Sequence, residues 1–560
     1  MNIEELARKW ALKNAVDHGG KAIVGAVISK IFAEAPELKK EAKEVARIVA
    51  KVVEEINKLP LETQKKLMEK YTYNLPKKEE RKGLPDLPDA EEGKVVTRFP
   101  PEPGGYIHLG NLRSALVSYM YAKKYKGKFV LRFEDTNPAK PKLPYYEAIE
   151  EDLRAVGIKW DTKIYESDRF DLYYKYAREL IEKGVAYVCT CPPDVVKKLR
   201  EEKKPCEHRD QSIEENLELW DRMLEGGFAE GEAVLRLKMP LEDWKNPAFR
   251  DPVLFRIITS VPHPRTGYKY HVYPTYNMAC AIEDGLYITH VLRGKEHDAN
   301  THIQTFIQKN IEDLHVPVHV GFGRIHVAGD SAIPMGKRYI RQALKDGKIE
   351  GWGDVRVPTV RSLLNRGILP ETLWQFFEEI GPKKTDIHVD MKVIYGINRK
   401  FLDPKARRYF FVPDPVRVIV EDAPALDVAV PYHPDVDMGK RHYKFPEGRH
   451  QFFLARRDIE RGEKIRLKYL YNIVIEEVGE DVLARFAGKE IGREKKVQWV
   501  PDINPIDAEI VHPSGEKITG LLEYWGQELK KGDIVQLERV CFARVRENHG
   551  EKIVFYWTHD

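Results

Sequence analysis

Two short stretches of this chain carry residue types that suit the binding of a polyphosphate. The first, GYIHLGN beginning at Gly105, places His108, Gly110 and Asn111 at the start of a predicted helix over residues 108–125. An imidazole N–H can donate to a phosphate oxygen, glycine lets a nucleotide approach the backbone, and a helix N-terminus attracts anions. The pattern therefore predicts a nucleotide site, although a capped helix start after a proline turn has the same sequence.

The second stretch is Pro334-Met335-Gly336-Lys337-Arg338, on a loop before another helical segment. Adjacent cations on a loop with a glycine hinge can move onto a leaving pyrophosphate and neutralise the charge that develops there. Taken alone, the same residues also fit a solvated basic helix start. The two stretches together favour an enzyme that uses a nucleotide.

A third group of residues has the spacing of metal ligands. Cys189-x-Cys191 is followed by Cys206-x-His208, so three cysteines and a histidine occur within twenty positions. Two such turns can close a tetrahedral Zn²⁺ site, and four protein ligands leave no open position for catalysis. The spacing predicts a structural zinc site, with free thiols in a β-hairpin as the alternative.

A basic and aromatic stretch, NRKFLDPKARRYFF over 398–411, has the composition of an RNA contact. It carries five basic residues around one acid and ends in three aromatic residues. Basic side chains neutralise phosphates, and aromatic rings stack on single-stranded bases. A solvated edge strand is the alternative for any single position.

The elements that must position these groups fall into blocks. Residues 1–75 have helical periodicity, and 76–93 form a charged, Pro-rich linker. Strands and helices alternate over 94–188 and again over 266–327, separated by a mixed, Cys-bearing insertion at 189–265. Helices return over 328–392, and short strands with frequent turns fill 393–560. This order predicts an α/β region with a parallel doubly wound sheet, followed by all-β barrels.

Composition limits the class of protein. The net charge is only +4, so a surface for nucleic acid must come from local basic patches. Five cysteines in 560 residues give no disulfide framework and fit a reducing compartment. No apolar run is long enough for a membrane span and no signal peptide is recognisable, so we expect a cytoplasmic protein without membrane contact.

The two polyphosphate stretches together resemble the HIGH and KMSKS signatures of class I aminoacyl-tRNA synthetases. RFPPEPGGYIHLG, LRFEDTNP, NPAFRDPVLFRI, YPTYNMACAIED and GWGDVRVPTVRSLLNRGI resemble the glutamyl/glutaminyl-tRNA synthetase subfamily, in the same order, over about residues 90–400. The β-rich remainder resembles the anticodon-binding barrels of glutaminyl and archaeal or eukaryotic-type glutamyl enzymes. The chain departs from the signatures at Pro334 and Gly336, where KMSKS has Lys and Ser, and at Asn111, where the first motif has His.

The resemblance implies a Rossmann-type catalytic domain with an inserted acceptor-binding domain, a helical domain and anticodon-binding β-barrels, preceded by an N-terminal helical domain. It implies ATP-dependent ligation of L-glutamate to tRNA-Glu through a glutamyl-adenylate, with Mg²⁺ and with transfer to the 2′-OH of the terminal adenosine. Charging of tRNA-Gln as well stays open. The alternatives are a glutaminyl-tRNA synthetase and a non-catalytic tRNA-binding paralogue. We expect a monomer, whose N-terminal domain either docks another protein or contacts tRNA.

Glutamate is favoured over glutamine by the charges that the resemblance places around the amino acid. Glu134 should accept the α-ammonium group, and Tyr276 can donate to the γ-oxygen. Arg293 lies where glutaminyl enzymes have a small uncharged residue, and with Arg98 it would suit a γ-carboxylate. A carboxamide would leave a buried cation unpaired. The alternative role for Arg293 is an ion pair with a nearby acid, Glu296 or Asp298.

The resemblance assigns the remaining roles residue by residue. Catalysis falls to His108, Asn111, Lys337 and Arg338. Substrate binding falls to Arg98, Pro100, Glu102, Glu134, Tyr276 and Arg293. ATP binding falls to Gly105, His108, Gly110, Asn111, Met335 and Lys337. Arg408, Gln536 and Arg539 match anticodon-contacting residues, and some bacterial glutamyl enzymes carry a zinc site like the one predicted at Cys189, Cys191, Cys206 and His208.

Overall fold

A computed structural model describes residues 3–71, 83–329, 331–334 and 336–560. The chain forms two compact units, Met1–Lys82 and Gly83–Asp560. Residues 76–82 of the predicted linker and Met335 of the predicted ATP site lie outside the described residues. Among the described residues, no helix combines the length and the apolar character that a bilayer crossing requires.

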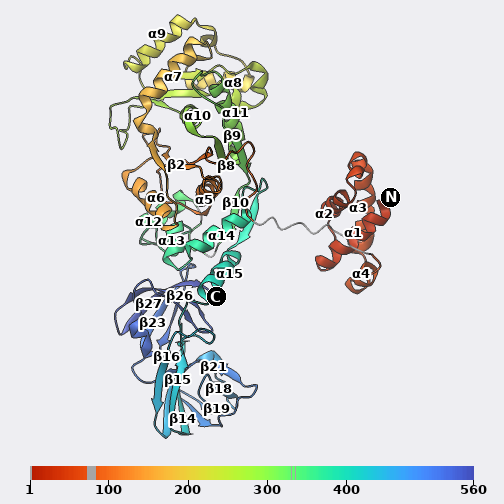
Figure 1. Cartoon of the computed structure of the whole chain (residues 1–560), viewed down its shortest axis with the longest axis vertical. Coiled ribbons are helices and arrows are strands. Elements are labelled where there is room, and N and C mark those ends of the chain that lie inside the picture. The colour runs from red at the N-terminus through yellow and green to blue at the C-terminus, as the bar shows by residue number, and fades with distance from the viewer. Residues whose placement is uncertain (1–2, 72–82, 330, 335) are drawn as a thin grey trace. The chain divides into compact units, whose positions relative to one another are not determined.

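The first unit is a small helical bundle, drawn in red in Figure 1. Its elements are α1 (Ile3–Asp17), α2 (Val24–Glu34), the 3-10 turn η1 (Pro36–Glu41), α3 (Ala42–Asn57) and α4 (Leu61–Met68). Val45, Val49, Val52, Val53 and Ile56 recur on one face of α3 and are buried in its core with Trp10 of α1. The predicted helical periodicity of this segment is therefore confirmed.

The second unit begins with a parallel sheet, as the alternation of strands and helices predicts. Its strands are β1 (Val96–Phe99), β2 (Lys128–Phe133) and β3 (Thr162–Tyr165), with β8 (His290–Gly294) paired to β9 (Val318–Phe322). Hydrogen bonds between Val96 and Thr289 place β8 beside β1. The helices are α5 (Leu109–Lys124), α6 (Leu143–Ala155), α7 (Phe170–Glu182), α10 (Tyr276–Tyr287) and α11 (Asp298–Lys309).

An antiparallel sheet interrupts the parallel one. It contains β4 (Ala186–Cys189), β5 (Val234–Leu237), β6 (Val253–Ile257) and β7 (Val272–Pro274), with α8 (Pro193–Glu202) and α9 (Ile213–Leu224) between β4 and β5. The sheet begins before and ends after the predicted insertion, residues 189–265. Tyr187, Cys189 and Cys206 form a small core of their own, which brings the cysteine turns together.

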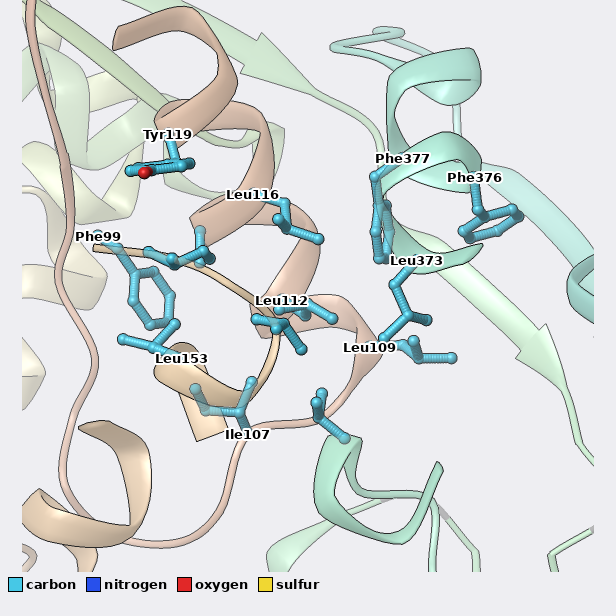
Figure 2. Packing of buried hydrophobic residues seen from close by; sticks show 14 of the residues in the cluster. Phe99, Ile107, Leu109, Leu112, Leu116, Tyr119, Leu153, Leu373, Phe376 and Phe377 are labelled. Atoms are coloured by element: carbon cyan, nitrogen blue, oxygen red, sulfur yellow. The ribbon is translucent and has the colours of Figure 1, made fainter. Parts of the chain in front are cut away.

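Helix α5 joins the sheet to the helices that follow it. The latter are α12 (Lys337–Lys345), α13 (Val360–Asn365), α14 (Pro370–Ile380) and α15 (Met391–Leu402), with β10 (Ile325–Ala328) parallel to β11 (Ile387–Asp390). Figure 2 shows Leu112 and Leu116 of α5 packed between Phe99 on one side and Leu373 and Phe377 of α14 on the other. A motif at the start of α5 is thus held from two sides.

The C-terminal region from Arg408 onward consists of strands and short 3-10 turns, as the turn spacing predicts (blue in Figure 1). Residues 393–402 of the predicted β-region belong instead to helix α15. One seven-stranded sheet has the order β12-β25-β26-β27-β23-β24-β13, a second has the order β21-β18-β19-β20-β14-β17-β22, and β15 pairs with β16. The strands of the first sheet are β12 (Arg408–Tyr409), β13 (Phe411–Pro413), β23 (Ile506–Val511), β24 (Lys517–Leu522), β25 (Ile534–Leu537), β26 (Cys541–Asn548) and β27 (Lys552–His559). The others are β14 (Pro415–Ala423), β15 (Leu426–Pro431), β16 (Lys440–Phe445), β17 (Gly448–Ala455), β18 (Lys464–Leu467), β19 (Asn472–Val478), β20 (Val482–Phe486), β21 (Lys495–Val497) and β22 (Val500–Pro501).

Candidate active site

A cavity of about 460 Å³ opens where β1 and β8 end and α5 begins. Ligands of open α/β sheets bind beyond the carboxyl ends of the strands, so this is the expected place for a substrate. The predicted site residues that line the cavity are Arg98, Pro100, Glu102, Gly105, His108, Gly110, Asn111, Glu134, Tyr276, Arg293 and Lys337. Arg338 is exposed and does not line it.

His108 is the N-cap of α5, and its ring orientation is fixed by the backbone. Its Nδ1 accepts from the N–H groups of Gly110, at 3.1 Å, and Asn111, at 3.4 Å, so the ring hydrogen lies on Nε2. A side chain at position 110 would bring Cβ to 2.9 Å from the ring, which explains the glycine. Burial, helped by the nearby charge of Lys337, lowers the pKa of His108 to about 4. The ring is therefore a neutral donor facing the cavity.

Lys337 reaches across the glycine turn that precedes His108. A Cβ at Gly105 would lie 3.1 to 3.2 Å from three carbons of the lysine side chain, so glycine leaves the path open. The ammonium group lies 3.7 Å from the carboxylate of Glu102, and burial lowers the pKa of Lys337. Arg341, one helical turn later, donates to the carbonyl of Gly104 at 2.5 Å. Two cations of α12 thus approach the first motif.

Glu134 forms the acidic wall of the cavity. The thiol of Cys280 donates to its Oε1 at 3.0 Å, and Arg132 lies 3.7 Å away. Burial raises the pKa of Glu134, since these neighbours do not fully offset its loss of water. A substrate ammonium group would supply the missing positive charge.

Arg98 is completely buried and already has a partner. Its guanidinium makes two hydrogen bonds of 3.1 Å to Asp284, which also accepts from Arg132 at 2.7 Å. The two arginines hold the pKa of Asp284 well below its usual range even though burial opposes them. Arg98 therefore contributes charge to the cavity from a fixed position and not as a free cation.

Arg293 differs from Arg98, because all of its hydrogen-bond partners are neutral side chains. It donates to Gln304 at 2.8 Å and Thr301 at 2.6 Å, and contacts Tyr276 at 3.4 Å. Glu296 pairs with Arg324 instead, and no ion pair among the described residues includes Arg293. The predicted alternative, a structural ion pair, is thus not what the structure has. A cation that is only 6% exposed faces the cavity with no carboxylate in ion-pair contact among the described residues, although its charge helps to lower the pKa of Asp284.

Three neighbours of the site were not foreseen from the sequence: Arg341, Cys280 and His319. His319 lies 3.5 Å from Arg293, its Nε2 is buried without a partner, and burial lowers its pKa to about 4. Arg341 is separated from Gly104 by 237 positions and Cys280 from Glu134 by 146. No local pattern marks such residues, because only the fold brings them to the cavity.

The four predicted metal ligands meet at one point. One ligand atom from each of Cys189, Cys191, Cys206 and His208 lies within 4.8 Å of every other. The Cys189 and Cys206 sulfurs are 3.8 Å apart, too far for a disulfide and equal to the edge of about 3.8 Å of a tetrahedron with 2.3 Å Zn–S bonds.

Groups around the cluster suit a bound cation. The His208 Nδ1 lies 3.2 Å from the Cys191 sulfur, while its Nε2 bonds the Thr190 hydroxyl at 2.8 Å. An outer partner of this kind fixes the ring of a metal-binding histidine. The buried Arg236 lies 3.7 Å from the Cys206 sulfur and offsets the charge of a thiolate. The donor set fits zinc.

Two of the predicted anticodon residues lie on the first β-sheet, and Arg539 lies in the turn between β25 and β26. Arg408 and Gln536 are direct partners in the parallel pairing of β12 with β25. Arg539 makes two hydrogen bonds to Asp458, at 2.8 and 3.0 Å, and its φ of 58° lies in the left-handed region. Strained backbone of this kind is frequent at binding sites. The guanidinium of Arg539, however, is already paired with Asp458.

Comparison with known proteins gives one consistent family. Residues 94–404 match the catalytic domain of class I tRNA synthetases (E and Q), and residues 406–487 match their anti-codon binding domain. The chain is 45% identical over 580 residues to a Glutamate--tRNA ligase of Pyrococcus furiosus and 46% identical over 579 residues to one of Pyrococcus abyssi, each covering both chains fully. A Glutamate--tRNA ligase of Pyrobaculum aerophilum is 41% identical over 573 residues, covering 98% of each chain.

Among solved structures, a glutamate tRNA ligase from Elizabethkingia meningosepticum, in complex with its amino acid, resembles part of the chain. The match covers 55% of this chain and 69% of that one, with 20% identity and a TM-score of 0.40. A likeness this weak places no residue of the site.

Proposed function

The chain belongs to the family of class I tRNA synthetases for glutamate and glutamine, and we propose that it ligates L-glutamate to tRNA at the expense of ATP. Full-length relatives that carry the name Glutamate--tRNA ligase support the activity. The observation that carries the choice of amino acid is the buried Arg293, which makes no ion pair with any described residue. A γ-carboxylate would supply that charge, and a carboxamide would not.

The reaction needs no protein nucleophile. The α-carboxylate of glutamate attacks the α-phosphorus of ATP and displaces pyrophosphate, which forms the glutamyl-adenylate. A terminal tRNA hydroxyl then attacks the activated carbonyl, loses its proton and displaces AMP. The Nε2–H of His108 and the ammonium of Lys337 donate to phosphate oxygens as charge develops on them. Glu134 holds the α-ammonium, which orients the carboxylate. Tyr276 and Arg293 hold the γ-carboxylate.

A magnesium ion would enter with ATP. Mg²⁺ is usually held by one or two carboxylates and by substrate phosphates, and Glu102 lines the cavity beside Lys337. The residues therefore fit the ion, whose chemistry is to neutralise charge on the leaving pyrophosphate. Lys337 must exchange Glu102 for a phosphate when ATP binds.

The test of the function is a charging assay with radiolabelled glutamate and glutamine. Purified tRNA-Glu and tRNA-Gln should be offered separately, because the breadth of tRNA selection is part of the question. We expect glutamate on tRNA-Glu, with glutamine used less well by about 10²-fold or more. Preferential charging with glutamine would establish the glutaminyl alternative. If neither amino acid is charged, the remaining alternative is a non-catalytic tRNA-binding paralogue.

We also propose that Cys189, Cys191, Cys206 and His208 hold a structural zinc ion. The sulfur separation of 3.8 Å and the Thr190 contact to His208 support it. Elemental analysis of the purified chain should find about one zinc per molecule, lost in Cys206→Ser. Cys541→Ser is the matched control, because Cys541 is buried elsewhere. Equal metal content in both variants would refute the site.

For the anticodon end we propose that Arg408, Gln536 and Arg539 contact the tRNA. The match of residues 406–487 supports Arg408, and Gln536 is its direct partner in the pairing of β12 with β25. We further propose that the protein is a monomer and is cytoplasmic; the absence of a disulfide among its five cysteines supports a reducing compartment. Deleting the separate unit Met1–Lys82 tests whether this unit contacts tRNA or docks another protein. A raised KM for tRNA indicates a tRNA contact, and an unchanged KM indicates a docking unit.

A further inference from the structure

Arg341 on α12 makes a contact that the proposed mechanism does not use. It lies four residues after Lys337, and residues four apart lie on the same face of a helix. Its Nη2 donates to the carbonyl oxygen of Gly104 at 2.5 Å, across 237 positions of the sequence. Two basic residues on one face of α12 therefore reach the glycine turn that precedes His108.

Gly104 lies within a small group of charged side chains. A Cβ at Gly104 would come to 3.0 Å from Oε1 of Glu102 and to 3.3 Å from the ammonium nitrogen of Lys337. That ammonium nitrogen lies 3.7 Å from Oε1 of Glu102, whose Oε2 accepts from Lys140 at 2.8 Å. These charged residues, which we call the turn cluster, are Glu102, Lys140, Lys337 and Arg341.

The turn cluster holds more positive than negative charge. Lys140 and Lys337 share the carboxylate of Glu102, and Arg341 makes no ion pair with any described residue. Burial lowers the pKa of Lys337, and the charges of Arg341 and Lys140 add to this effect although Glu102 opposes it. Three cations around one carboxylate favour the binding of a further anion.

The sequence gives a reason for an additional cation at this place. Position 334 is Pro where the KMSKS signature has Lys, so the loop before α12 carries one cation fewer than the signature. Arg341 is exposed, and one of the five N–H groups of its guanidinium bonds Gly104. The other N–H groups have no partner among the described residues and can donate to phosphate oxygens while the Gly104 contact is kept.

We propose that Arg341 is a further catalytic residue, which binds the β- and γ-phosphate oxygens of ATP and replaces the lysine that position 334 lacks. The inference rests on the proposed ATP-dependent ligation. As the α-carboxylate of glutamate bonds to the α-phosphorus, the bond from that phosphorus to the bridging oxygen breaks, and pyrophosphate leaves with the electron pair. Arg341 stays protonated throughout and stabilises the negative charge that develops on the leaving group.

A structural link between α12 and the glycine turn is the other explanation of the Gly104 contact. Such a link would affect all ligands of the cavity alike, because it would hold the walls of the cavity in place. A phosphate contact affects only the ligands that carry the β- and γ-phosphates. Ligands with different numbers of phosphates therefore separate the two roles.

The first test compares the binding of ATP, AMP and inorganic pyrophosphate, with Mg²⁺ present, to the wild-type chain and to Arg341→Gln. Isothermal titration calorimetry measures the dissociation constants. Because a charge-assisted hydrogen bond is lost, we expect Kd for ATP and for pyrophosphate to rise about 10-fold, with Kd for AMP unchanged. Lys345→Gln removes an exposed cation from the far end of α12, so it is the matched control and should behave as wild type.

The second test moves the charge. Arg341→Gln should lower the single-turnover rate of adenylate formation by about 10-fold or more, with an unchanged KM for glutamate. Adding Pro334→Lys to this variant places a cation where the signature has one, and most of the rate should return.

Two results would overturn the inference. Equal weakening of ATP and AMP binding in Arg341→Gln, or no change in either, would refute the phosphate contact. No recovery of the rate with Pro334→Lys would refute the replacement of the missing lysine. A wild-type chain that charges no tRNA with glutamate would overturn the proposed function instead.

Discussion

Arg293 in the cleft and Arg441 in the β-region are both buried, yet their surroundings differ in one respect. Arg441 on β16 and Glu523 after β24 are fully buried and form an ion pair, and Glu523 also accepts from the N–H of Phe410 and the hydroxyl of Tyr443. Arg293 has neutral partners only. The chain pairs one buried arginine with a carboxylate and leaves the other without a carboxylate in contact among the described residues.

The difference distinguishes a buried charge that serves the fold from a buried charge that serves ligand binding. A buried ion pair is self-contained, and removing one partner strands the other at a cost of several kcal/mol. A buried cation without a counter-ion costs stability in the free protein and is retained where a ligand brings the missing charge. Burial of a charged side chain therefore does not by itself indicate function, whereas burial without an ion-pair partner does.

The largest expected effect tests the compensated pair. Glu523→Gln leaves Arg441 buried without an anion, and we expect a loss of about 3–5 kcal/mol in unfolding free energy. Chemical denaturation, followed by tryptophan fluorescence, measures it. The double variant Arg441→Met, Glu523→Leu should recover most of the loss. If the single and double variants were equally unstable, the buried charge of Arg441 would not be the cause of the loss.

The second prediction concerns the uncompensated cation. Arg293→Met should lower kcat/KM for glutamate by about 10²- to 10³-fold, because the γ-carboxylate loses its buried partner. Its unfolding midpoint should stay the same or rise, since an unpaired buried charge is removed. Arg293→Cys, offered glutamate and glutamine in competition, should lose the preference for glutamate. An intact preference would exclude Arg293 from selection of the amino acid.

A third prediction separates binding from catalysis within the cleft. His108→Ala and Lys337→Ala should each lower the rate of adenylate formation by about 10²-fold or more, with little change in glutamate affinity. Both residues are the proposed donors to the phosphate oxygens, whereas Arg293 is the proposed partner of the γ-carboxylate. Single-turnover kinetics measure the step, and Lys345→Ala is the control because Lys345 is exposed at the far end of the same helix, α12. Near wild-type turnover would remove the mutated residue from the mechanism.

The smallest effect is on the pH dependence of stability. The pKa of His108 is lowered from 6.5 to about 4, so both native and unfolded chains hold it neutral above about pH 6.5. As the pH falls from about 6.5 towards 4, only the unfolded chain binds the proton, and native stability decreases. By about pH 5.5 this amounts to about 1 kcal/mol. Chemical denaturation at about pH 7 and about pH 5.5 measures this loss of stability, and His108→Asn should lose less stability between the two pH values than the wild-type chain. An equal loss in both chains would show that another group causes it.

The pocket of phosphate-binding groups could be anticipated because its signals are local. The GYIHLGN stretch and the helix that follows it occur within one segment, and α5 begins at Leu109 with His108 as its cap. Alternating strands and helices, and later short strands with frequent turns, reflect backbone geometry over a few residues each. These features depend on neighbours in sequence, so the sequence alone determined the parallel sheet, the all-β region and the family resemblance.

Pairing of charges was decided by the tertiary structure. Arg98 meets Asp284 across 186 positions, and Arg441 meets Glu523 across 82. Arg293 is unpaired because Glu296, a near neighbour in sequence, turns to Arg324. Which cation is neutralised and which awaits a ligand depends on distances that only the folded chain sets, since a Coulomb interaction acts through space and not along the sequence.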